Sequence, residues 1–232
     1  MKRLISKLKM GVTFLSVVTI FSSCGDDDKT NGGNVTGSDT DVYVTVGSGV
    51  WANGQLLDME EHISDIYGSC IYWSDLYLAG TKSGTAAIWR GGETKILGSD
   101  GDSSGALSVY VSNGVVYAAG YKTNDLKNIA MLWEGSSAVP LTNGDNDAQA
   151  YSVFVVLDDV YVAGYESNGT NKVAKIWKNR IATLLSSGDS DAEAYSVYVH
   201  NGDVYVAGYE TIGANRVAKL WKNGTPSELT DG

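Results

Sequence analysis

The chain has 232 residues, with 28 glycines, 2 prolines, 14 tyrosines and a formal net charge of −10. Helix interiors tolerate glycine poorly, whereas tight turns between strands use it, so this composition favours an all-β protein. The acidic charge argues against nucleic acid as a partner, because binding to phosphate backbones depends on basic side chains.

The N-terminal residues 1–23 have the pattern of an export signal. Four basic side chains among the first nine residues precede an apolar run from Met10 to Phe21, which is the order of a signal peptide. The run is shorter than the roughly 20 residues that a membrane-spanning helix needs. It ends in Phe21-Ser22-Ser23-Cys24, and small residues before a cysteine resemble a bacterial lipobox.

The lipobox resemblance implies that the Cys24 thiol receives a diacylglycerol, that the peptide is cut before this cysteine, and that the new N-terminus is acylated. Two or more acyl chains anchor a protein stably, so we expect an outer-membrane lipoprotein whose partner is the membrane. An incidental cysteine after an ordinary signal peptide is the alternative. Removing residues 1–23 takes away four basic and no acidic side chains, which changes the net charge from −10 to −14.

Residues 24–40 are expected to be a tether between the anchor and a folded domain of residues 41–232. The tether begins with Gly25-Asp26-Asp27-Asp28-Lys29, which resembles the surface-export signal of Bacteroidetes lipoproteins and implies exposure to the medium. A solvated acidic spacer is the other reading, so periplasmic and outward orientations both stay open. The Gly, Asn, Ser and Thr residues that follow predict a flexible segment.

The folded domain repeats itself every 44 residues. Four full units are marked by tryptophans, and the same phase carries an Ala-Gly pair. Each unit contains four short apolar segments separated by turn residues, which predicts a β-propeller of four-stranded blades. The marker tryptophans are Trp89, Trp133, Trp177 and Trp221.

The third full unit illustrates the predicted strands, which are 151–156, 160–165, 173–178 and 182–185. Asp158-Asp159, or an Asn-Gly pair in sister units, is expected to close the first hairpin. The last hairpin should turn at Asn-Gly, a rule that Asn179-Arg180 breaks. We expect the tryptophans to pack on neighbouring blades, and the small residues to let backbones approach near the axis.

An earlier partial unit, residues 42–54, has candidates for the second to fourth strands of a blade but no obvious first strand. Three arrangements remain open: a five-unit ring with one three-stranded blade, an open array completed by a partner chain, and a truncated reading frame. The five-unit ring is favoured, because an open array would leave edges that are prone to association.

Two stretches of the repeat resemble a known family. Residues 144–165 and 188–209 share a Gly-Asp-x-Asp-Ala turn, a Tyr-Ser-Val strand and a Val-Tyr-Val-Ala-Gly-Tyr strand, and these motifs resemble the bacterial SBBP-type β-propeller repeat. The resemblance covers residues from about 41 to the end. It implies an extracellular or surface location, and no shared chemistry.

No catalytic set is predicted. The histidines His62 and His200 lie at unrelated phases of the repeat without a partner for a relay, and Cys70 takes a repeated apolar position that predicts a small buried side chain. The recurrent polar feature is an Asp-x-Asp turn at the blade junctions, which could bind calcium or serve the turn alone. These aspartates are Asp100 and Asp102, Asp145 and Asp147, and Asp189 and Asp191.

The sequence therefore predicts a surface-anchored, non-catalytic domain that binds a protein or glycan. The alternative functions are a carbohydrate-active enzyme of the propeller type, or a fragment of a longer propeller. An enzyme would use carboxylates that break the repeat, and those are Glu60, Glu61, Asp65 and Asp125.

Overall fold

The fold is taken from a computed structural model of the chain. It describes residues 19–20, 43–46, 49–52, 55–57, 59, 62–73, 75–99, 103–124 and 126–231. These residues form strands and turns, and none of them forms a helix that could span a membrane.

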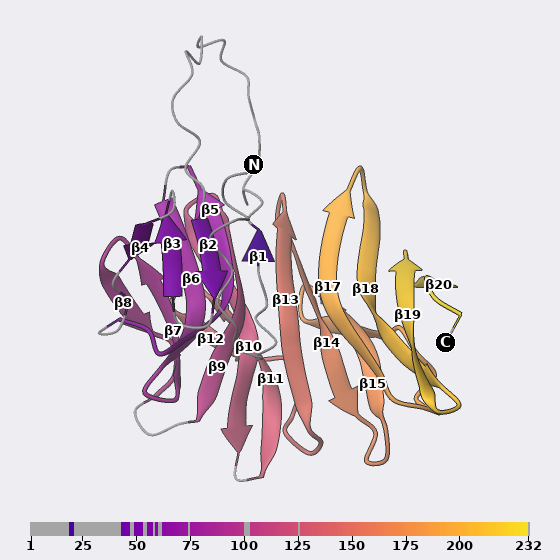
Figure 1. The fold of residues 1–232 in the computed structure, drawn as a ribbon. Helices are drawn as coiled ribbons and strands as arrows, with labels where there is room; N and C mark the ends of the chain where they lie inside the picture. Colours follow the sequence, from indigo (N-terminus) through magenta and orange to yellow (C-terminus); the bar gives the residue numbers. More distant parts are fainter. Residues whose placement is uncertain are drawn as a thin grey trace, which may run out of the picture.

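Within the described residues, twenty strands form five four-stranded sheets (Figure 1). In each sheet the strands pair antiparallel with their neighbours in the chain, which gives the four-stranded blades that the repeat predicted. The strands of the first two sheets are β1 (Thr19–Ile20), β2 (Tyr43–Val46), β3 (Gly49–Ala52), β4 (Gln55–Leu57), β5 (Asp65–Tyr72), β6 (Asp75–Lys82), β7 (Thr85–Arg90) and β8 (Glu93–Ile96). Those of the third to fifth sheets are β9 (Ser104–Ser112), β10 (Val115–Asn124), β11 (Lys127–Glu134), β12 (Ser137–Pro140), β13 (Ala148–Val156), β14 (Asp159–Ser167), β15 (Lys172–Lys178), β16 (Ile181–Leu184), β17 (Ala192–His200), β18 (Asp203–Ile212), β19 (Asn215–Lys222) and β20 (Thr225–Glu228).

A β-bulge recurs at one place in the first strand of every full blade. In the fourth sheet, the register between β13 and β14 shifts between Ala150 and Ser152, so that Tyr151 has no partner. The residue opposite is Gly164, where a Cβ atom would lie 2.0 Å from the carbonyl oxygen of Gln149. The Ala-Gly pair of the repeat is therefore needed because the bulged strand passes too close for a side chain.

The blades pack face to face through small side chains and one tryptophan. Trp177 is 1% exposed and shares a core cluster with Ala119 and Ala130 of the preceding blade. Trp221 is buried in the same way in a cluster with Ala163 and Ala174. The prediction that the tryptophans are packing residues is confirmed at these junctions, where a large ring fills the space left by paired alanines.

The five sheets follow one another in chain order. The first strands β5, β9, β13 and β17 lie side by side, and the first sheet joins the second through a cluster that contains Val50, Met59 and Leu78. Within the described strands, the first and last sheets are not among the closely packed pairs.

The two-residue strand β1 lies within the apolar run that the sequence marks as a signal peptide. Thr19 and Ile20 pair with Thr45 and Val44 of β2, where the partial unit lacked a candidate strand. Cleavage before Cys24 would remove this pairing and leave the first sheet with the three strands β2, β3 and β4.

The tight turns depend on residues with positive φ. Asn179 and Arg180 have φ angles of 50° and 72°, so this turn keeps the shape of its Asn-Gly counterparts although arginine replaces glycine. Arg180 is also bound to Glu134 of the preceding blade at 2.8 Å. The first hairpin of the fourth sheet turns at Leu157 and Asp158 rather than at Asp158-Asp159, because Asp159 already belongs to β14.

Candidate functional site

The bulge brings tyrosines from two neighbouring blades together. Tyr151 of β13 and Tyr195 of β17 are the bulged residues of their strands, and their ring centroids lie 5.1 Å apart. Each also lies 5.9 Å from a tyrosine of the second strand in its own blade, Tyr165 or Tyr209. We call these four residues the tyrosine cluster. Tyr195 is 45% exposed, whereas Tyr165 and Tyr209 are buried.

A buried carboxylate holds the cluster together. Glu193 is 3% exposed and accepts hydrogen bonds from the hydroxyls of Tyr151 at 2.5 Å and Tyr209 at 2.8 Å. It also forms an ion pair of 2.9 Å with Lys172, which belongs to the preceding blade. A buried carboxylate needs such donors to offset its desolvation, so Glu193 fixes the two blades and the tyrosines in one arrangement.

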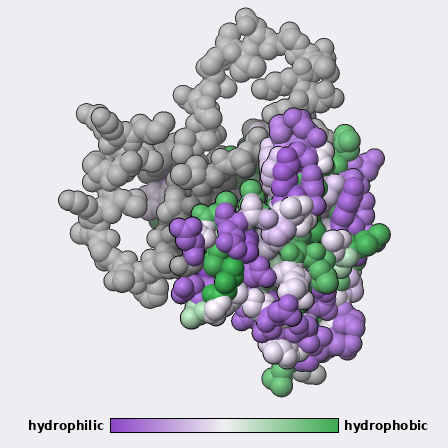
Figure 2. All heavy atoms as spheres, turned by 90° about the vertical axis from the view of Figure 1, so that its right-hand side faces the viewer, coloured by the Kyte–Doolittle hydropathy of each residue, from purple (hydrophilic) through white to green (hydrophobic). Residues whose placement is uncertain are grey.

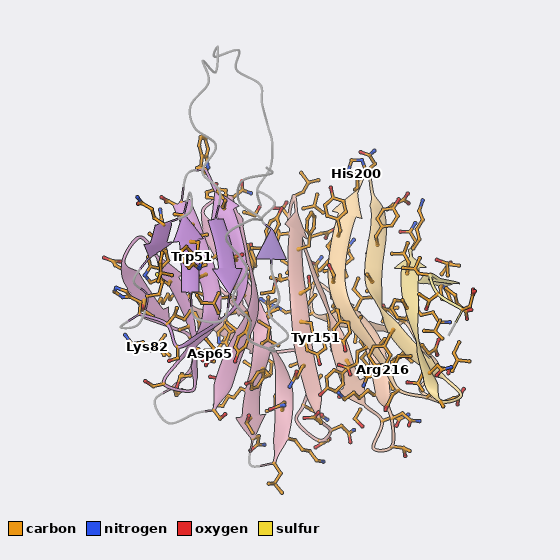
Figure 3. All side chains as sticks on the ribbon, viewed as in Figure 1. Trp51, Asp65, Lys82, Tyr151, His200 and Arg216 are labelled. Atoms are coloured by element: carbon orange, nitrogen blue, oxygen red, sulfur yellow. The ribbon has the colours of Figure 1, made fainter. Side chains whose placement is uncertain are left out.

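Two cations complete the cluster. The Lys172 ammonium lies 4.4 Å from the ring centroid of Tyr165, and the Arg216 guanidinium lies 4.5 Å from that of Tyr209. Arg216 is exposed. Figure 3 shows Tyr151 and Arg216 toward the same end of the blades, with His200 at the opposite end.

Burial keeps the cluster hydroxyls protonated. Desolvation raises the pKa of Tyr151 far above its usual range, and the hydrogen bond to Glu193 raises it further. The same two causes raise the pKa of Tyr209, and for Tyr165 the second cause is its hydrogen bond to Asp147. The hydroxyls therefore act as hydrogen-bond donors at neutral pH, and a tyrosinate nucleophile is not available here.

The arrangement suits recognition of a polar ring. Tyr195 offers an accessible aromatic face, and the exposed Arg216 supplies a charged donor in the same cluster. Tyrosine combines an apolar face with a polar tip, which is how proteins bind partly polar surfaces. The sequence analysis missed Glu193. Its signal was available, because the equivalent positions of the other full units hold Asp65, Gly105 and Gln149.

The Asp-x-Asp turns lie at the blade junctions, as expected. One Asp147 oxygen accepts the main-chain N–H of Asn128 at 3.0 Å, and the other accepts the hydroxyl of Tyr165. Asp191 repeats the first contact with the N–H of Lys172 at 2.8 Å. The second aspartate of each described turn therefore links consecutive blades.

The first aspartates serve the turns themselves. Asp145 accepts a hydrogen bond from the Asn143 amide at 2.6 Å, and the Asp189 N–H donates to Ser187 at 3.3 Å. Among the residues that the structure describes, no three His, Cys, Asp or Glu side chains gather as metal ligands. Asp100 and Asp102 lie outside the described residues, and calcium binding stays a prediction.

The other acidic residues named from the sequence are not brought together in the described part of the chain. Glu60, Glu61 and Asp125 lie outside it, as does Cys24. Asp65 accepts a hydrogen bond of 2.9 Å from the hydroxyl of Thr81.

Cys70 is 1% exposed in a core cluster, so its predicted burial is confirmed. Its sulfur is part of a disulfide, a cross-link that the sequence analysis did not expect. The sequence holds one other cysteine, Cys24. A sulfur atom cannot carry both a lipid thioether and a disulfide, so lipidation of Cys24 requires Cys70 to be a thiol.

A groove of about 410 Å³ lies between the second and third sheets. Its walls include Tyr77, Arg90, Val115 and Trp133. Arg90 is already paired with Asp75 at 2.5 Å and lies 5.1 Å from the ring centroid of Tyr77. The same contact, in which a cation pairs with an aspartate and lies near a tyrosine ring, recurs in the fourth and fifth sheets. This groove is therefore a structural feature of the repeat.

Comparison with known proteins finds similar solved structures but no family. No family model and no curated protein matches the chain, so the SBBP-type assignment stays a prediction. Among solved structures, the chain is similar to a GH43_12 protein retrieved from a capybara gut metagenome, with 13% identity and a TM-score of 0.42 over 71% of this chain and 41% of that one. It is also similar to the β-propeller domain of the Trilobed protease from Pyrococcus furiosus, with 13% identity and a TM-score of 0.49 over 82% of this chain and 66% of that one.

The chain thus spans less than two thirds of the length of either solved structure. Its own four-stranded antiparallel blades, packed in chain order around adjacent first strands, define an all-β protein of the β-propeller class.

Proposed function

We propose that this chain is a surface-anchored lipoprotein whose propeller-type domain binds a ligand without catalysing a reaction, and that the ligand is a glycan. The tyrosine cluster carries the proposal. It combines an exposed ring on Tyr195 with the exposed guanidinium of Arg216, whereas its carboxylate, Glu193, is enclosed by three donors and not presented to a substrate.

The binding test uses the full-length protein in detergent and soluble polysaccharides as probes. The substitution Tyr195→Ala removes the exposed ring and should weaken glycan binding by about fivefold, since a stacked aromatic ring contributes about 1 kcal/mol. Trp73→Ala is the matched control, because Trp73 is 87% exposed at a hairpin tip outside the cluster. Equal affinity of the wild type and the Tyr195→Ala variant would refute the glycan site. Binding of a protein instead of the polysaccharides would favour the protein-ligand form of the hypothesis.

The lipid anchor is tested separately. Cys24→Ala should move the protein from the membrane fraction to the soluble fraction, because the acyl chains are lost. Intact mass of the membrane-bound protein should show the added acyl chains. A protein without the added lipid mass would contradict the anchor. Digestion of intact cells with protease would distinguish outward from periplasmic orientation.

A carbohydrate-active enzyme is the second candidate, and one observation favours it: Glu193 is a buried carboxylate at a position where the other full units differ. Glycosidases need two carboxyl groups on either side of the scissile bond. The same polysaccharides should therefore be assayed for new reducing ends. Turnover that is lost in Glu193→Gln would replace the binding function with an enzymatic one.

A further inference from the structure

The two terminal sheets expose complementary halves of the junction that joins the blades inside the chain. At an internal junction, a tryptophan of one blade is buried with two alanines of the blade before it. These alanines are fully buried in the second, third and fourth sheets, and they are Ala79, Ala86, Ala119, Ala130, Ala163 and Ala174.

Among the described strands, none packs closely on the receiving half of the last sheet. Ala207 and Ala218 take the positions of Ala163 and Ala174, but both are partly exposed. Leu229 is 60% exposed where its counterpart Leu185 is 7% exposed. Tyr198 is 53% exposed at the position of Phe154, whose ring packs edge-on against it with the centroids 5.1 Å apart. We call this surface the open face of the last sheet.

Figure 2 looks at the side of the molecule that carries the last sheet. Hydrophobic residues reach the surface there between hydrophilic ones. Exposed apolar residues that continue a packing pattern mark an interaction surface.

The first sheet carries the inserting half. Trp51 of β3 takes the position of the marker tryptophans, yet it is 41% exposed, whereas Trp177 and Trp221 are at most 1% exposed. Its cross-strand partner is Leu56, which is 58% exposed. The other face of β3 is turned inward, because Val50 is fully buried in the cluster shared with the second sheet. Trp51 and Leu56 therefore point away from the second sheet.

We propose that the open face of the last sheet binds the first sheet of a second copy of this chain, with Trp51 and Leu56 of that copy packing on Ala207 and Ala218. The occupant is a second copy because the chain itself contains the docking pattern several times and presents both halves at once. Within the described strands, the first and last sheets of one chain are not closely packed, so one copy does not use its own Trp51 in this way.

Such a contact is head-to-tail, since different surfaces of the two copies meet. Head-to-tail contacts build rings when the rotation closes and open chains of copies when it does not. The contact is independent of the proposed glycan binding, because Trp51, Leu56 and Ala207 lie outside the tyrosine cluster.

The test blocks the two halves in separate variants of the full-length protein in detergent. Trp51→Glu blocks the first sheet, and Ala207→Glu blocks the last sheet. Both positions are exposed to some degree, so we expect both variants to fold. Leu56→Glu and Leu229→Glu form a second pair of variants at more exposed positions, and Trp73→Glu is the control outside both faces.

Sedimentation velocity should show that the wild type and the Trp73→Glu variant associate with rising concentration, whereas each blocked variant stays a monomer. Mixing Trp51→Glu with Ala207→Glu should restore association, but only to a pair. The first variant keeps an unblocked last sheet and the second keeps an unblocked first sheet, so a single contact can form. A folded wild type that stays a monomer at all concentrations overturns the proposal. So does a mixture of folded variants that forms no pair, or association that the substitutions leave unchanged.

Discussion

Glu193 is a single side chain that determines the hydrogen bonding of the tyrosine cluster. The repeat supplies the bulge, the tyrosines and the glycine opposite them. Glu193 adds a charge that reaches Tyr151, Tyr209 and Lys172 from one buried point. A tyrosine hydroxyl with such an acceptor ionises only at a much higher pH than in the unfolded chain.

This difference predicts a loss of stability in alkaline solution. The pKa of Tyr209 is raised in the folded state by burial and by Glu193. Its contribution is therefore fully present below about pH 10, where the tyrosines of the unfolded chain are protonated as well, and it is lost as the pH rises above that value, because only the unfolded chain releases the proton. The free energy of unfolding, measured with denaturant between pH 8 and pH 11, should fall above about pH 10.

Tyr209→Phe is the control for this effect. The variant lacks the ionising hydroxyl, so its alkaline slope should be shallower by one proton than that of the wild type. An unchanged slope in Tyr209→Phe would show that other groups cause the alkaline loss.

At the scale of the element, the β15–β16 hairpin combines an unfavourable residue with a compensating contact. Arg180 has a φ angle of 72°, which costs a residue with a Cβ atom about 1 kcal/mol or more relative to glycine. Its ion pair with Glu134 of the preceding blade is largely exposed, and exposed pairs contribute about 0–1 kcal/mol. The turn is therefore kept at a small net cost.

Arg180→Gly should accordingly stabilise the protein when the ion pair is already absent. In a Glu134→Gln background, we expect the free energy of unfolding to rise by about 1 kcal/mol. In the wild-type background the gain should be smaller, because the ion pair is lost at the same time. Chemical denaturation of the four proteins in this cycle measures both the cost of the turn and the contribution of the ion pair. A double variant Glu134→Gln/Arg180→Gly that is less stable than Glu134→Gln alone would show that the turn is not strained.

The sequence predicted the elements well where the repeat is regular and less well where the bulge intervenes. The first strand of the third full unit was expected at 151–156 and runs over Ala148–Val156. The prediction began at the tyrosine because the residues before it are small. Those small residues are still paired, since β13 continues beyond the bulge to Ala148. A bulge breaks the alternation of side chains on which strand prediction depends.

At the scale of the whole molecule, the blades differ in how many neighbours they have. The fourth sheet is covered on both faces, whereas the last sheet has its open face. Stability in repeat arrays is approximately a sum over blades and their interfaces, so a blade with one interface opens more easily than a blade with two.

Hydrogen exchange should show this difference along the chain. Amides of β18 and β19 should exchange faster than the equivalent amides of β14 and β15, measured on the monomeric Ala207→Glu variant by mass spectrometry. The bonding pattern is the same in both sheets, so the comparison isolates the missing interface. Equal protection in the two sheets would mean that the domain unfolds as a single unit.

Architecture and blade packing could be predicted from the sequence because both follow from a period of 44 residues. The sequence marks Glu193 as a departure from the repeat but does not show its partners, because Glu193 and Lys172 meet across two blades and are separated by 21 residues. No local pattern links them, and only the packing of consecutive blades brings them together. The open face of the last sheet and the exposure of Trp51 could not be predicted from the sequence either, because exposure depends on what packs against each sheet.

The hairpin between β19 and β20 also affects how the protein ages chemically. Asn-Gly pairs deamidate readily, because the glycine nitrogen is free to attack the asparagine side chain. In this hairpin the Asn223 amide is held at both ends, accepting the Val204 N–H and donating to Asp203, each at 2.8 Å. The side chain must leave both partners before it can cyclise onto Gly224. The isoaspartate that accumulates at this position in a stored sample would therefore record how often β18 and β19 have separated.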